Sequence, residues 1–166
     1  MKTTIARLLA ATSLTLALSP ALSPVFAADT EPSPTAAAAD KLAPVRAQIA
    51  QKNWVAAIAA LKNVNDTGSA DWNNLMGFTL RKAPTPDFAG AEKFYNEALR
   101  IDPKHKGALE YSGELYLMLG ELPKAEQRLA TLDKLCTFGC AEYSDLKKAI
   151  ANFKAAGNKY VGSSTY

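Results

Sequence analysis

Two cysteines are the residues whose type and spacing most suggest chemistry. Cys136 and Cys140 stand four positions apart, and the chain has no other cysteine. A thioredoxin-like redox motif has two residues between its thiols, whereas three separate these. In an exported protein such a pair favours a disulfide, and Gly139 makes the turn flexible enough to close. Two alternatives stay open, a thiol redox switch and a Cu(I) site with Met118 as an extra ligand.

The other chemistry-bearing side chains do not form a catalytic set. His105 is the only histidine, it follows Pro103 in a predicted turn, and the sequence places no base or ligand set near it. Acidic pairs such as Glu110 and Glu114 fall on predicted helix positions that face solvent or a partner. No Gly-rich phosphate loop, HExxH, GxSxG or CxxC motif is present. We therefore expect a protein that is not an enzyme and that has no cofactor and no metal site.

A pattern that recurs every 34 residues predicts the elements of the fold. Ala57, Ala91 and Ala125 keep this spacing. Each is followed four residues later by a larger apolar residue, and seven residues later by a valine, an alanine or a leucine. Residues three and four apart lie on one face of a helix. A fixed period of this length is typical of a stacked helical array. The residues expected to pack within and between the repeats are Ala57, Gly77, Ala91, Tyr95, Ala98, Gly113, Tyr116 and Ala125.

Two stretches resemble the tetratricopeptide repeat (TPR) family. They are Gly113–Gly120 together with Ala125–Leu132, and Ala91–Pro103. The resemblance extends over about residues 40–135 and implies an all-α fold of three helical hairpins with a C-terminal capping helix. The run Leu135–Leu146 is also similar to the tail of a group of small exported bacterial TPR proteins.

The N-terminal residues have the pattern of a secretory signal. A positive start precedes the largely apolar run Leu8–Leu18, and small residues end the segment at Ala27. The apolar run is too short for a confident membrane span, although a retained anchor is the alternative. Cleavage removes Lys2 and Arg7 and no acidic residue, so the formal net charge falls from +3 to +1. We expect a periplasmic protein with no membrane span after cleavage.

The chain is therefore divided into a signal, a linker, a helical domain and a tail. The expected ranges are 1–27 for the signal peptide, 28–39 for a disordered linker, 40–156 for the TPR-like domain and 157–166 for a flexible tail. Within the domain, repeats are expected at about 40–68, 69–102 and 103–136, and the capping helix at 141–155. Lys and Arg are spread along the chain, which argues against nucleic-acid binding.

The resemblance implies that the first helices of successive repeats line a groove for an unidentified protein or peptide partner. Carried onto matching positions, the groove contains Arg46, Asn74, Phe78, Arg81, Lys82, Glu110, Glu114, Leu117 and Met118. We expect a periplasmic interaction module or adaptor, in which substitution of both Arg81 and Glu114 weakens binding without unfolding the protein. The alternatives are copper or redox handling through Cys136 and Cys140, and self-association as a homo-oligomer through an end of the stack.

Overall fold

A computed structural model describes residues 40–162, and this part of the chain is helical with no β-strand. The predicted signal peptide and linker, over 1–27 and 28–39, lie outside the described residues, as do residues 163–166. The helices are α1 (Ala43–Ala50), α2 (Trp54–Val64), α3 (Ala70–Lys82), α4 (Phe88–Ile101), α5 (Lys106–Met118), α6 (Leu122–Leu135) and α7 (Ala141–Ala155).

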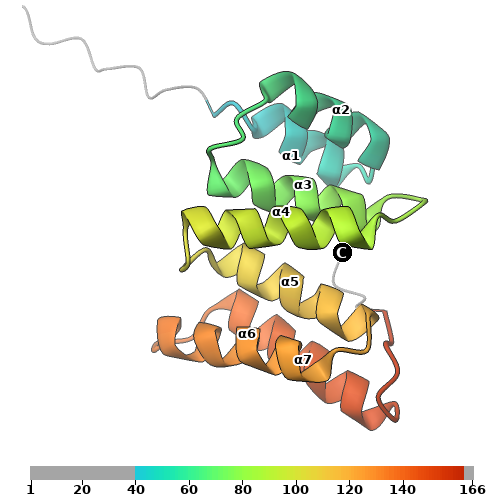
Figure 1. Cartoon of the computed structure of the whole chain (residues 1–166), viewed down its shortest axis with the longest axis vertical. Coiled ribbons are helices and arrows are strands. Elements are labelled where there is room, and N and C mark those ends of the chain that lie inside the picture. Colours follow the sequence, from blue (N-terminus) through green and yellow to red (C-terminus); the bar gives the residue numbers. More distant parts are fainter. Residues whose placement is uncertain (1–39, 163–166) are drawn as a thin grey trace, which may run out of the picture. The chain divides into compact units, whose positions relative to one another are not determined.

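Consecutive helices pack as hairpins that follow one another along the domain (Figure 1). The pairs are α1 with α2, α3 with α4, and α5 with α6, and each pair also contacts the next through α2 with α3 and α4 with α5. The last helix, α7, packs against both α5 and α6 and so covers one end of the stack. The predicted all-α hairpin array is confirmed.

Two glycines explain why the helices approach so closely. A Cβ atom added to Gly77 of α3 would lie 2.8 Å from the ring of Tyr95 in α4, and one added to Gly113 of α5 would lie 2.5 Å from Leu146 in α7. Neither distance leaves room for a methyl group, so glycine is needed at both positions despite its cost in a helix. Ala91 of α4 and Ala125 of α6 are also fully buried.

The chain after α7 turns back instead of leaving the domain. Gly157 and Asn158 have positive φ angles of 70° and 61°. The Gly157 N–H donates to the carbonyl of Lys154, and the Asn158 N–H donates to that of Phe153. This is the Schellman pattern of helix termination, in which the left-handed residue reverses the chain.

From this turn the chain runs back toward the end of α5 (Figure 1). Tyr160 is half-buried and packs on the hydrophobic cluster of α5, α6 and α7. The helix-ending turn thus places one aromatic side chain, that of Tyr160, within reach of the core. The flexible tail over 157–166 stays a prediction.

Candidate partner-binding site

Three aromatic side chains, one from each hairpin, form a row along one side of the stack. The ring of Trp54, at the start of α2, meets that of Phe78 in α3 edge-on at a centroid distance of 6.0 Å. Phe78 in turn lies 4.8 Å from the ring of Tyr111 in α5. Edge-on and tilted contacts at these distances are favourable for aromatic rings. The row therefore links the three hairpins on one side of the domain.

Arg81 lies at the centre of this row. Its guanidinium carbon is 5.6 Å from the ring centroid of Phe78 and 5.7 Å from that of Tyr111, which are cation–π distances. Its Nη1 atom is 2.8 Å from Oε2 of Glu114, and the two side chains are only 1% and 2% exposed. We call the surface formed by Trp54, Phe78, Arg81, Tyr111 and Glu114 the inner face.

The charge on Arg81 is balanced by Glu114, and the hydroxyl of Tyr95 also interacts with the guanidinium. Burial alone would lower the pKa of Arg81, but Tyr95 and Glu114 outweigh it and raise that pKa above its ordinary value. The guanidinium therefore remains charged. A charged group in a buried site needs such partners, so Glu114 and Tyr95 hold Arg81 in place between the hairpins.

A second cation and a pocket extend the inner face. The Nζ atom of Lys82 lies 6.0 Å from the ring centroid of Phe78. Burial and the neighbouring Arg81 lower the pKa of Lys82. At the α1 end, Ile49, Ala50, Lys52, Trp54 and Phe78 line a largely apolar pocket of about 170 Å³. The inner face thus offers apolar surface and positive charge side by side.

The residues predicted for the groove fall into a buried set and a more exposed set. Outside the buried set, Arg46 is exposed, and Lys82 and Met118 are partly exposed. The buried set is Asn74, Phe78, Arg81, Glu110, Glu114 and Leu117.

Burial changes the expectation for Arg81 and Glu114. In this structure they pair with each other between α3 and α5 and do not face an open groove. Substituting them removes an interaction between hairpins, so the expectation that the double substitution affects binding alone is corrected.

Two members of the inner face, Trp54 and Tyr111, are not among the residues predicted for the groove, although aromatic residues next to predicted groove positions are a usable signal. Tyr160 lies beyond the last helix, where no periodic pattern exists. Its only sequence signal is Gly157, a residue that permits the chain to reverse.

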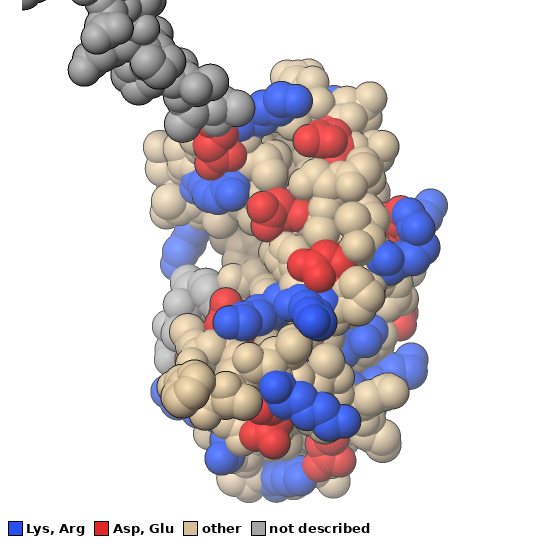
Figure 2. Space-filling view, turned by 90° about the vertical axis from the view of Figure 1, so that its left-hand side faces the viewer, with Lys and Arg blue, Asp and Glu red and all other residues tan. Residues whose placement is uncertain are grey.

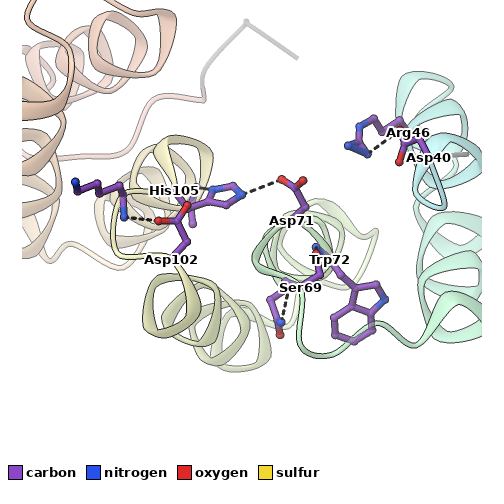
Figure 3. A network of polar contacts seen from close by, with 10 residues as sticks. Asp40, Arg46, Ser69, Asp71, Trp72, Asp102 and His105 are labelled. Carbon is purple, nitrogen blue, oxygen red and sulfur yellow. Dashed lines mark hydrogen bonds and ion pairs between the residues drawn. The ribbon is translucent and has the colours of Figure 1, made fainter. Parts of the chain in front are cut away.

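His105 has a structural role that its sequence position does not reveal (Figure 3). Its Nδ1 atom accepts a hydrogen bond from the N–H of Ala108, which caps α5. Its Nε2 atom is 3.0 Å from Oδ1 of Asp71 in α3, so the ring proton sits on Nε2 and points to that carboxylate. The side chain is only 13% exposed. His105 therefore joins two hairpins rather than standing free in a turn.

The predicted disulfide between Cys136 and Cys140 is confirmed. It joins the end of α6 to the start of α7, where Cys140 Sγ also accepts from the N–H of Tyr143 as the helix cap. Over residues 40–162, no cluster of three or more His, Cys, Asp or Glu side chains could hold a metal ion. The bonded pair thus has a clear structural role at this junction.

On the face of the molecule shown in Figure 2, acidic and basic side chains are interspersed, and neither sign of charge forms a patch of its own. Within the part of the chain that the structure describes, no helix is both long and apolar enough to span a membrane.

Comparison with known proteins identifies one family. Residues 87–150, from the cap of α4 into α7, match the tetratricopeptide repeat family model. The predicted resemblance is confirmed over this stretch. No curated protein matches the sequence.

Proposed function

Because this chain carries tetratricopeptide repeats, we propose that it is a non-catalytic interaction module that binds a peptide or protein segment on its inner face. Such repeats generally mediate contacts between proteins. The observation that carries the assignment to this face is the aromatic row of Trp54, Phe78 and Tyr111, which joins the three hairpins and has Lys82 at its edge.

The composition of the inner face supports this proposal. Tryptophan, tyrosine and arginine are the residues that contribute most to binding energy at protein interfaces. Here Trp54, Tyr111 and Arg81 gather within one continuous row. The rings of Trp54 and Tyr111 are partly exposed and supply apolar contact area, and the partly exposed Lys82 beside them supplies positive charge. An extended segment with an aromatic or long apolar side chain fits such a surface.

We propose that the protein acts in the periplasm. Two features support this location. The N-terminal sequence has the pattern of a cleaved secretory signal ending at Ala27. The disulfide between Cys136 and Cys140 is a bond that persists mainly in oxidising compartments.

Affinity capture from the cell envelope with matched variants tests the proposed function. Lys82→Glu reverses a charge at the edge of the inner face, and Lys93→Glu makes the same change at an exposed position on α4. We expect a partner that is retained by the wild type and by Lys93→Glu and is lost with Lys82→Glu. Circular dichroism should show that all three proteins are equally helical. Equal retention by all three would show that the inner face is not the binding site.

A further inference from the structure

The first hairpin carries an apolar helix face that the rest of the described chain leaves exposed. Helix α2 packs against α1 and α3, and its buried residues are Ala57 and Leu61. Val55, Ala56 and Ala59 of the same helix are exposed, Val55 by 73%. Terminal repeats of a helical array usually turn a polar face outward, which keeps the array soluble. The exposed face of α2 departs from that rule.

An open pocket lies on this face, between α2 and the loop that follows α3. It has a volume of about 450 Å³ and a mostly apolar lining, made of Lys52, Asn53, Trp54, Val55, Ala56, Ala59 and Pro84. A lining of this kind takes an apolar side chain in preference to a polar one. We call this hollow the α2 pocket.

The last hairpin ends in the complementary feature, an aromatic side chain that projects from a closed turn. Phe138 is fully exposed and belongs to none of the hydrophobic clusters found among residues 40–162. The turn is closed by the disulfide between Cys136 and Cys140 and by the N–H of Gly139, which donates to the carbonyl of Cys136 at 2.8 Å. Turns of this kind usually hold small or polar residues, so the fold does not require an aromatic one. A side chain on a closed turn loses little freedom on binding.

Charge favours a contact between these two ends of the domain. Residues 131–145, around Phe138, contain three acidic residues and one basic residue, so this stretch has a formal net charge of −2. Residues 50–64, around the α2 pocket, contain two lysines and no acidic residue, and one of them, Lys52, lines the pocket. Opposite charges around an apolar contact speed association and fix its orientation.

The two features lie in different hairpins and cannot meet within one molecule. Helix α2 packs in the first hairpin, whereas the disulfide turn joins α6 to α7 at the other end of the stack (Figure 1). We propose that Phe138 of one molecule inserts into the α2 pocket of a second copy, so that the protein associates head to tail. Phe138 and Val55 are the two most exposed large apolar side chains among the described residues, and this contact buries both.

The contact is weak and extends beyond a pair. One aromatic side chain and the rim around it bury less than the roughly 1,600 Å² of a standard interface, and small interfaces are transient. Each associated pair still has one unoccupied pocket and one unoccupied aromatic side chain, so further copies add unless a ring closes. The inference is separate from the proposed function, because neither Phe138 nor Val55 belongs to the inner face.

Sedimentation velocity over a concentration series tests the proposal, with protein purified from the cell envelope. Phe138→Asp removes the projecting ring, Val55→Asp puts a charge in the pocket, and Val161→Asp makes the same change at an exposed apolar residue outside both. Aspartate is favourable in turns and in the first turn of a helix, so both test variants should keep their helical circular dichroism.

The wild type and Val161→Asp should increase in mean mass as the concentration rises. Phe138→Asp and Val55→Asp should each associate at least about tenfold more weakly, as expected for the loss of an aromatic anchor. A wild type that stays monomeric at every concentration would overturn the proposal, as would either test variant associating as strongly as the wild type.

Mixing the two test variants decides whether the association is head to tail. Phe138→Asp keeps the pocket and Val55→Asp keeps the ring, so an equimolar mixture should form a one-to-one dimer that grows no further. A mixture that stays monomeric would contradict the head-to-tail arrangement.

Cross-linking reads the same contact without a disruptive substitution. A photoreactive phenylalanine analogue at position 138 should give a covalent dimer in which mass spectrometry maps the cross-link to residues 52–59 of the second copy. A dimer cross-linked elsewhere, or no dimer, would refute the assignment of the pocket.

Discussion

Glu114→Gln should destabilise the protein strongly, because it leaves the charge of Arg81 buried without its counter-ion. The side chains are 1% and 2% exposed, and the closest atoms, Nη1 and Oε2, are 2.8 Å apart. With an effective dielectric constant of about 20, two unit charges at this distance attract by roughly 6 kcal/mol. The glutamine oxygen retains part of this interaction as a neutral acceptor. Removing one member of a buried pair typically costs about 3–5 kcal/mol, and we expect a loss in this range.

Urea unfolding followed by circular dichroism measures this loss. The matched control is Arg100→Ala, which breaks a similarly short ion pair with Glu97 at 2.7 Å on the exposed surface. The control should not change the unfolding midpoint measurably, because solvent screens exposed pairs. Replacing Arg81 and Glu114 together by methionine should restore most of the stability, since no unpaired charge remains. The reasoning is refuted if Glu114→Gln matches the control, or if the double variant is less stable than Glu114→Gln.

Four further predictions concern the contacts that hold the hairpins. Gly77→Ala should destabilise by about 1–3 kcal/mol in thermal unfolding, despite alanine's better helix propensity, because the added Cβ would lie 2.8 Å from the buried ring of Tyr95; an unchanged Tm would contradict this register. His105→Ala should cost about 0.5–2 kcal/mol by chemical denaturation because α5 loses its cap, and a neutral result would show that the cap contributes nothing. Replacing Cys136 and Cys140 by serine should cost about 2 kcal/mol in the chain-entropy model, and reduction of the wild type should give the same change in urea midpoint. Burial raises the pKa of Tyr95, so the folded state keeps this phenol proton to higher pH than the unfolded chain does. The contribution of this proton to the free energy of unfolding is present below about pH 10 and is lost as the pH rises further. Tyr95→Phe should therefore reduce the loss of stability at alkaline pH in a pH series of melts.

The repeat framework could be predicted from the sequence because small residues recur at a fixed spacing. Gly77 and Gly113 carry a cost in a helix that only close packing explains, and the structure places the ring of Tyr95 and the side chain of Leu146 against them. Periodicity of this kind reports which residues share a helix face. It therefore predicts the helices and their packing surfaces well.

The candidate site could be predicted only in part, because periodicity does not report what covers a helix face. Arg81 and Glu114 were correctly placed on the first helices of neighbouring hairpins, but their burial and mutual pairing depend on distances between elements. The sequence places His105 only in a turn, since its acceptor Asp71 lies 34 residues away and becomes a neighbour only when the hairpins pack. The contact of Tyr160 arises from a chain reversal after the last helix, where no repeat exists to guide the reading.

Site-specific photo-cross-linking in cells tests most directly whether the inner face is the binding site. A photoreactive amino acid placed at Lys82, at the edge of the inner face, is compared with one at Lys93, exposed on α4. We predict a discrete covalent adduct with a partner protein from position 82 and none from position 93. Adducts of equal yield from both positions, or from position 93 alone, would contradict the account.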